Sequence, residues 1–400
     1  MTTESQLVQA GQTYLYPNYR QPPFVFVRGQ GSVLWDASGK RYLDMYAGIA
    51  VSTLGHAHPK LTAAIAEQAG KLLHVSNYFY NEPNVRLAEK LCRLSGMDRA
   101  FFCNSGTEAI EATLKLARRH FYAKGQPERQ RIIAFRNSFH GRTLGALAAT
   151  GQDKYKDGFG PLPGVSHVAY GDLEAVRQAM TADVAGILVE PVQGEGGVLP
   201  APPGFLRGLR TLADSHGVLL LADEVQTGIG RTGTFLAFQG EGVEADVVAL
   251  AKALGGGVPI GAMVCKKFLE EALPPGSHGS TFGGNPLASA AALAVLDVLE
   301  NDGLVSNVKQ RGEELSGLLG KVVGKFPKLV ECARGRGLLQ ALVLRDGVDA
   351  RKVMSTMQES GVLLTIAGGQ ALRFSPPLIV TQSEIEEAVG RLSDALSIYG

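Results

Sequence analysis

The chain has no excess of charge of either sign. Its 39 lysine and arginine residues are balanced by 38 aspartate and glutamate residues, which leaves a formal net charge of +1 over 400 residues. A protein that binds nucleic acid or an anionic membrane through its surface charge normally carries a basic excess. The composition therefore gives no electrostatic reason to expect either partner.

Cysteine is scarce. The four cysteines are Cys92, Cys103, Cys265 and Cys332, and no two are close enough in sequence for a metal knuckle or a redox pair. Three of them stand in apolar stretches, where a cysteine packs as a small hydrophobic residue. The sequence therefore predicts reduced thiols and a cytoplasmic location.

Long apolar runs are absent as well. The segment from Met1 to Leu15 is polar and lacks the apolar core of a secretory signal. The longest apolar helix-like run, Leu287 to Leu299, is shorter than the roughly 20 residues that span a membrane. We therefore expect a protein without a membrane-spanning segment. Because one hydrophobic core rarely serves more than about 250–300 residues, we also expect more than one domain.

The sequence does contain short apolar runs that alternate with helical patterns. Continuous apolar runs of this kind are typical of parallel strands buried on both faces. They cover Arg131–Phe135, Gly186–Glu190, Gly217–Ala222, Asp246–Ala251 and Ala262–Cys265. After Pro286 the pattern changes to long helices followed by shorter strands. We predict an α/β fold with a mostly parallel central sheet in a large domain (56–286), a small α+β domain (287–400), and an N-terminal segment (1–55) that packs with the small domain.

Polar residues follow several of these strands, at the edge where open α/β sheets bind their ligands. Ser105, Gly106 and Thr107 follow the strand Ala100–Cys103 and open a helix, as in a phosphate cradle or a plain helix cap. Asp223 follows another strand and would need a partner if buried, for example a protonated pyridine nitrogen. A structural role explains each feature at least as well when it is taken alone.

Two further strands end in the same informative way. Lys252 follows Asp246–Ala251, where a desolvated amine can form a Schiff base, although a lysine that reaches solvent is the simpler interpretation. Phe139 and Arg142 follow Arg131–Phe135 and could stack on a flat cofactor and bind a carboxylate. A phosphate site, a ring-nitrogen acid, a stacking ring and an amine nucleophile together form the set that pyridoxal 5'-phosphate requires.

Two other patterns are not predicted to be functional. Gly228–Gly233 matches the GxGxxG pattern, but it does not follow a strand directly and does not open a helix, so a dinucleotide site is not expected. His56 and His58 have no third ligand nearby in the sequence, so no metal site is expected.

Over nearly its whole length the chain resembles the class III, ornithine-type aminotransferases, which have the type I pyridoxal-phosphate fold. The shared motifs are Leu54–Pro59, Asn104–Ala109, Ser138–Thr143, Glu190–Gly197, Asp223–Gly228, Ala251–Lys252 and Ser280–Pro286. Within this family the chain is most similar to the acetylornithine aminotransferases.

The resemblance implies a role for each residue of the cofactor site. Lys252 would hold the cofactor covalently and move the proton, and Asp223 would keep the ring nitrogen protonated. The other cofactor-binding residues would be Ser105, Gly106, Thr107, Phe139, Val225, Gln226 and Thr281. Because Thr281 would come from a partner subunit, the resemblance implies an obligate homodimer with shared sites.

The resemblance also implies how small-molecule substrates bind. Arg142, with Ser280 of the partner, would grip the distant carboxylate of the amino donor, and Arg373 would bind the α-carboxylate of glutamate or 2-oxoglutarate. Glu195 would pair with Arg373 while the other substrate is bound. Such a pair avoids leaving a buried guanidinium without a partner, which is costly.

One departure from the family pattern bears on the substrate. Ornithine aminotransferases carry a tyrosine six residues before the glycine of the Gly-His motif, whereas this chain has Ile49. This favours N2-acetyl-L-ornithine as donor, with 2-oxoglutarate as acceptor, in arginine biosynthesis. Ornithine, succinylornithine, 4-aminobutyrate and a carrier-protein-linked amine stay open, as does a glutamate-semialdehyde 1,2-aminomutase. A non-catalytic relative is disfavoured because Lys252, Asp223, Thr107 and Thr281 are all present.

Overall fold

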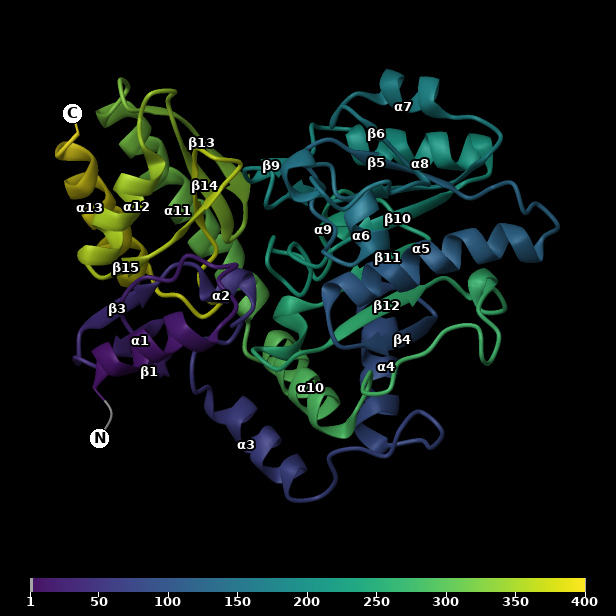
Figure 1. Ribbon diagram of the computed structural model, residues 1–400, viewed down its shortest axis with the longest axis horizontal. Helices are drawn as coiled ribbons and strands as arrows, with labels where there is room; N and C mark the ends of the chain where they lie inside the picture. The colour runs from purple at the N-terminus through teal and green to yellow at the C-terminus, as the bar shows by residue number, and fades with distance from the viewer. Residues whose placement is uncertain (1–2, 400) are drawn as a thin grey trace.

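The computed structural model describes residues 3–399, which form two lobes (Figure 1). One lobe contains a seven-stranded sheet, and the other contains two four-stranded sheets together with both ends of the described chain. Residues 1, 2 and 400, at the outer ends of the predicted N-terminal and C-terminal domains, lie outside the described range.

The seven-stranded sheet has the order β4-β12-β11-β10-β7-β5-β6. Its strands are β4 (Arg99–Cys103), β5 (Arg131–Phe135), β6 (Val165–Val168), β7 (Val184–Val189), β10 (Leu219–Asp223), β11 (Val247–Leu250) and β12 (Gly261–Cys265). The prediction of a mostly parallel sheet is confirmed, but β12 runs antiparallel to both of its neighbours. The prediction that the Ala262–Cys265 run is a parallel strand was wrong, because a strand buried on both faces is continuously apolar in either direction.

Two hydrophobic clusters cover the two faces of this sheet. In β10, Leu219 and Leu221 belong to one cluster, whereas Leu220 and Ala222 belong to the other, as the alternation of side chains along a strand requires. The helices around the sheet are α3 (Pro59–Ala69), α4 (Glu82–Ser95), α5 (Gly106–Ala123), α6 (Leu144–Ala149), α7 (Leu173–Ala179), α8 (Phe205–His216), α9 (Ala237–Gly240) and α10 (Pro286–Asn301). Helix α5 belongs to the first cluster, and α8 and α10 to the second.

The other lobe combines segments from both ends of the chain (Figure 1). One sheet contains β1 (Phe26–Gln30), β2 (Val33–Asp36), β3 (Arg41–Asp44) and β15 (Val362–Leu363), and β15 pairs with β3 in parallel. The second sheet, β13-β14-β17-β16, contains β13 (Val330–Arg336), β14 (Leu339–Leu344), β16 (Thr365–Ala367) and β17 (Ala371–Phe374). Because β3 of the N-terminal segment pairs with β15 of the C-terminal region, we propose three domains, residues 1–55, 56–286 and 287–400, with the first packed on the third.

The remaining helices belong mainly to this second lobe. They are α1 (Glu4–Tyr14), α2 (Ala47–Ala50), α11 (Leu304–Lys325), α12 (Ala350–Glu359) and α13 (Gln382–Ser397). Between residues 3 and 399, no helix combines the length and the apolar character needed to cross a membrane.

Candidate active site

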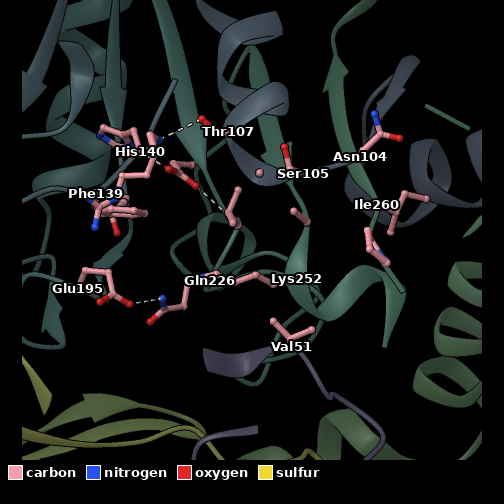
Figure 2. A pocket seen from close by; sticks show the side chains of 18 of the residues that line it. Val51, Asn104, Ser105, Thr107, Phe139, His140, Glu195, Gln226, Lys252 and Ile260 are labelled. Carbon is pink, nitrogen blue, oxygen red and sulfur yellow. Dashed lines mark hydrogen bonds and ion pairs between the residues drawn. The ribbon is translucent and has the colours of Figure 1, made fainter. Parts of the chain in front are cut away.

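A cavity of about 390 Å³ lies where several strands of the large sheet end. This volume is within the range of small-molecule sites. Ten of the predicted site residues line it: Ser105, Gly106, Thr107, Phe139, Arg142, Glu195, Asp223, Val225, Gln226 and Lys252. Figure 2 shows Phe139 and His140 on one side of the cavity, and Ser105 and Asn104 across from them. The fold therefore joins strand ends that are far apart in the sequence.

The amino end of α5 opens onto this cavity. Ser105 caps the helix, since its Oγ accepts a hydrogen bond from the backbone N–H of Glu108 at 3.3 Å. A side chain at Gly106 would collide with Val225, whose Cγ1 would lie 2.8 Å from the added Cβ. The bare turn leaves the first backbone N–H groups of the helix accessible to an anion, which is the usual way in which helix amino ends bind phosphate.

Asp223 ends β10 and is buried, with 4% of its surface exposed. Its Oδ2 lies 2.7 Å from Nδ1 of His140, and its Oδ1 accepts the backbone N–H of Val225 at 3.0 Å. Burial opposes protonation of His140, but the Asp223 carboxylate outweighs this effect and raises the histidine pKa. A buried carboxylate that favours a cationic partner suits a protonated ring nitrogen.

Glu190, directly after β7, is a lining residue to which the sequence analysis gave no role of its own. Its Oε1 accepts the N–H of Phe139 at 2.9 Å, and its Oε2 accepts the N–H of Gly194 at 3.3 Å. Burial raises the pKa of this carboxyl to about 7; His140 opposes the rise and Asp223 adds to it. One acid thus links the loop of Phe139 to the loop that carries Glu195.

Lys252 follows β11 and points its amine into the cavity (Figure 2). Its φ of 44° lies in the left-handed region, which is unusual for a lysine and is typical of constrained functional positions. Desolvation lowers the pKa of the amine, Arg373 acts in the same direction, and Glu195 and Asp223 oppose it. A lowered pKa increases the fraction of neutral amine, which is the nucleophilic form.

Arg373 in β17, from the other lobe, does not line the cavity itself but contacts two residues that do, Glu195 and Gln226. Its Nη1 lies 2.5 Å from Oε1 of Glu195 and 3.2 Å from Oε1 of Gln226. Gln226 in turn donates to Glu195 over 3.4 Å, as the dashed line in Figure 2 marks. Burial raises the pKa of Glu195, but Arg373 and Lys252 outweigh this and lower it, so the pair is ionic at neutral pH.

Phe139 and Arg142 both line the cavity. The Arg142 guanidinium carbon lies 4.0 Å from the ring centroid of Tyr155 and 5.4 Å from that of Phe139. Such cation–π contacts orient an exposed guanidinium without neutralising its charge. Arg142 therefore stays available to bind a carboxylate.

Ser280 and Thr281 do not line the cavity of their own chain. The Oγ of Ser280 accepts a hydrogen bond from Asn104 at 3.3 Å, and Thr281 is exposed. His56, weighed above as a metal ligand, pairs with Asp44 at 2.8 Å. Within residues 3–399, no group of three or more histidine, cysteine or acidic side chains is arranged to hold a metal ion.

These features fit a planar cofactor that carries a phosphate, a ring nitrogen and a carbonyl. The helix end can hold the phosphate, the buried Asp223 can hold a cationic nitrogen, and the Lys252 amine can reach a carbonyl. The collision expected for any side chain at Gly106 is consistent with this fit, because the backbone must stay bare there for a phosphate to approach.

Glu224 is adjacent to Asp223 but does not line the cavity. Its Oε1 accepts the N–H of Phe238 at 2.9 Å and its Oε2 accepts the hydroxyl of Thr227 at 2.5 Å. Burial raises its pKa to about 7 from 4.5. Between these two values the folded state keeps a proton that the unfolded chain releases, so this residue lowers stability as pH rises from about 4.5 to 7.

Glutamine at position 224 is expected to remove that dependence. Relative to the native chain, E224Q should gain about 2 kcal/mol of unfolding free energy between pH 5 and pH 8. Urea unfolding of both proteins at the two pH values measures the change, and other titrating groups cancel in the difference. A stability difference that is the same at both pH values would contradict the assignment.

Comparisons with known proteins identify the family of this chain. The family model described as "Aminotransferase class-III" matches residues 14–396. The chain is 52% identical to an acetylornithine aminotransferase of Myxococcus xanthus and 45% identical to a succinylornithine transaminase of Yersinia pseudotuberculosis; the alignments cover 95% and 96% of this chain, and 95% of each relative.

A solved structure extends the likeness to the whole fold. The structure of the ornithine aminotransferase of Toxoplasma gondii, which has partial occupancy of PLP at its active site, superposes with a TM-score of 0.96 at 35% identity. The superposition covers 100% of this chain and 95% of that one. The chain therefore belongs to the class-III aminotransferases.

Proposed function

We propose that this enzyme transfers the terminal amino group of N2-acetyl-L-ornithine to 2-oxoglutarate, giving N-acetylglutamate 5-semialdehyde and L-glutamate, a step of arginine biosynthesis. The observation that carries the proposal is the Arg373–Glu195 ion pair at 2.5 Å beside Lys252. The similarity to the acetylornithine aminotransferase of Myxococcus xanthus supports the same substrate.

The cofactor is pyridoxal 5'-phosphate. When bound, it supplies a carbonyl that accepts the amino group and a ring that takes up electrons from the reacting carbon. Gly106 and Thr107 would bind its phosphate through the helix end, Phe139 would stack on the ring, and Asp223 would hold the ring nitrogen. Gln226 would contact the phenolic oxygen, and Ser105 and Val225 would complete the wall.

Lys252 is the proposed nucleophile and proton carrier. Its amine is desolvated, which lowers its pKa and leaves a larger neutral fraction to accept a proton from the substrate. The lysine would then donate the same proton to a second, neighbouring atom in the cavity. His140 would hold Asp223 in place throughout, since the two side chains are 2.7 Å apart.

The Arg373–Glu195 pair lets one site serve two different substrates. Glutamate and 2-oxoglutarate bring an α-carboxylate next to the reacting carbon, and Arg373 would bind it after Glu195 moves away. Acetylornithine reacts at its terminal amine and brings no carboxylate to this place, so Glu195 would stay on Arg373. The distant carboxylate of the donor would bind Arg142, together with Ser280 of the partner subunit.

The substrate choice also depends on Ile49. This residue lies in α2, where Ala47, Ile49 and Ala50 all have positive φ values, and it is 39% exposed. It does not line the cavity of its own chain. An aliphatic side chain offers no hydrogen bond to the free α-amine of ornithine, which favours a donor whose α-amine is blocked.

A half-reaction experiment tests the substrate. The loaded enzyme is mixed with N-acetylornithine without acceptor, and its absorbance is followed between 300 and 500 nm, where the cofactor absorbs. Loss of the long-wavelength band, followed by glutamate formation when 2-oxoglutarate is added, is the expected result. Ornithine, succinylornithine and 4-aminobutyrate serve as competing donors. A faster reaction with one of them would replace our substrate, and glutamate semialdehyde converted without an acceptor would indicate an aminomutase.

We further propose an obligate homodimer. Thr281 and Phe282 form an exposed loop, and Phe282 is 60% exposed. Tyr78, Phe79 and Tyr80 lie on a neighbouring segment, because Asn77 donates to the carbonyls of Ser280 and Gly283 at 2.8 and 3.1 Å. An exposed aromatic patch of this kind is typical of a protein interface. A second copy would cover it and bring Thr281 to the partner's phosphate site.

Loss of the Thr281 hydroxyl is therefore expected to weaken cofactor binding about tenfold, the effect of losing one hydrogen bond to a charged group. Titration of apo T281A with pyridoxal phosphate measures the affinity, and sedimentation should give a mass about twice 42.3 kDa. Mixed dimers of T281A and K252A should regain activity at limiting cofactor, since one of their two sites is intact. A monomeric enzyme of full activity would refute the shared site.

We also propose a cytoplasmic location. Cys92, Cys103, Cys265 and Cys332 are all free thiols in the structure. Free cysteines are the usual state in a reducing compartment.

A further inference from the structure

Glu195 lies in a short hairpin formed by β8 (Val192–Gln193) and β9 (Leu199–Pro200). The hairpin follows a strand of the large sheet in the sequence, but its apolar side chains pack in the other lobe. Val192 and Val198 form a separate hydrophobic cluster with residues of β14 and β17, namely Leu339, Ala341, Val343 and Ala371. The hairpin is therefore anchored to the sheet that also carries Arg373.

The main chain of the hairpin is held to that lobe by hydrogen bonds. Arg334 in β13 donates from Nε at 3.1 Å and from Nη2 at 2.9 Å to the carbonyl of Gly197. The N–H of Gly368 donates to the carbonyl of Glu195 at 3.0 Å. Two carbonyls of the turn, those of Glu195 and Gly197, are thus held by residues of the other lobe.

The contact between the two backbones is close. A Cβ at Gly368 would lie 2.6 Å from the carbonyl oxygen of Gly196 and 2.9 Å from Cα of Gly197. A Cβ at Gly197 would lie 3.0 Å from Nη2 of Arg334. The turn therefore has no room to approach the sheet further, and it moves away only by breaking the bonds from Arg334 and Gly368.

These contacts fix the backbone of Glu195 in the same body as Arg373. Arg373 belongs to β17, which is paired with β14 on one side and β16 on the other. The lobe with the seven-stranded sheet also holds the hairpin, through two hydrogen bonds. The N–H of Gly194 donates to Glu190 at 3.3 Å, and the side-chain amide of Gln193 donates to the carbonyl of Arg136 at 2.9 Å. With its main chain held on both sides, Glu195 has only its side-chain torsions with which to leave Arg373.

We propose that Arg334 is a positioning residue that clamps the Glu195 turn, so that Glu195 exchanges on and off Arg373 by side-chain rotation, and that the clamp sets the preference between the two substrates. The proposal rests on the function proposed above. If the turn is held less firmly, Glu195 is displaced from Arg373 more easily, which favours a substrate that brings a carboxylate to Arg373. A donor that reacts while Glu195 stays paired with Arg373 is disfavoured by the same change.

The experiment compares two half-reactions in R334M, R334K and R336M. Arg336 is the matched control, because it lies on the same strand and also reaches the other lobe, through an ion pair with Glu241. In R334M we expect kcat/KM for acetylornithine to fall about tenfold, equivalent to about 1.4 kcal/mol, with a change of less than about threefold for glutamate. R334K, which keeps one donor nitrogen where Arg334 uses two, should retain part of the native ratio of the two kcat/KM values. R336M should retain the full native ratio.

A second measurement does not depend on activity. Hydrogen exchange of a peptide covering residues 192–200 should be faster in R334M than in the native chain, with and without cofactor, and unchanged in R336M. Equal losses in both half-reactions, the same behaviour in R336M, or unchanged exchange would each overturn the clamp. If R334M does not fold, R334K decides by the same criteria. If the native enzyme prefers another donor, the substrate proposal fails and the same comparison is made with that donor.

Discussion

Replacement of Lys252 by alanine is expected to lower turnover by about 10⁴- to 10⁶-fold, the size of effect seen when a catalytic nucleophile is removed. The amine is the only group we assign both to attack a carbonyl and to carry a proton between neighbouring atoms. No other lysine lines the cavity within the described residues. The measurement is steady-state glutamate formation, together with the absorbance band of the loaded enzyme.

Chemical rescue separates loss of the amine from loss of the fold. A small primary amine added to K252A fills the space that the lysine leaves, and it is expected to restore part of the half-reaction in proportion to its concentration. Lys266 provides the matched control, since it follows β12 and binds Glu244 and the carbonyl of Gly96, away from the cavity. K266A should keep its activity. If K252A without added amine were as active as the native enzyme, Lys252 would not be the catalytic nucleophile.

Substitution of Asp223 by asparagine is expected to lower kcat by about 10²- to 10³-fold. The asparagine keeps the shape but removes the charge that stabilises a protonated ring nitrogen, and the ring then withdraws electrons less strongly. His140 also loses the carboxylate that raises its pKa, so that pKa falls in the variant. Single-turnover kinetics of each half-reaction measure the effect.

The neighbouring acid supplies the control for this prediction. Glu224 is as buried as Asp223, but it binds Thr227 and the N–H of Phe238 instead of facing the cavity. E224Q should therefore retain activity, whereas D223E, which keeps the charge, should lose less than D223N. Equal activity in D223N and the native enzyme would show that the ring nitrogen does not depend on this carboxylate.

The sequence by itself determined the fold class and most of the cavity. Continuous apolar runs predict buried strands, and the residues that follow them predict a ligand site, because strand ends meet at one edge of an α/β sheet. Ten of the predicted residues line one cavity, including Lys252 and Asp223. The direction of β12 was beyond this reasoning, since burial on both faces produces the same pattern in either direction.

Other elements had too weak a local signal. The strand β13 and the helix α12 were not predicted, although the helix is amphipathic and is capped by Asp349. Their positions follow from packing against α11, β14 and α13 rather than from a distinctive local pattern. Glu190 and His140 lie in motifs that the sequence analysis quoted, but their roles depend on contacts with Gly194 and Asp223 that no spacing reveals.

Only the tertiary structure decided how the two lobes share the site. Arg373 is 178 residues from Glu195 in the sequence, and the two side chains pair because the hairpin of Glu195 packs on the sheet that contains β17. The sequence determines local propensity and burial, since these depend on near neighbours. Which distant backbone carbonyl a side chain such as Arg334 binds depends on the packing of whole sheets, and this is fixed only when the chain has folded.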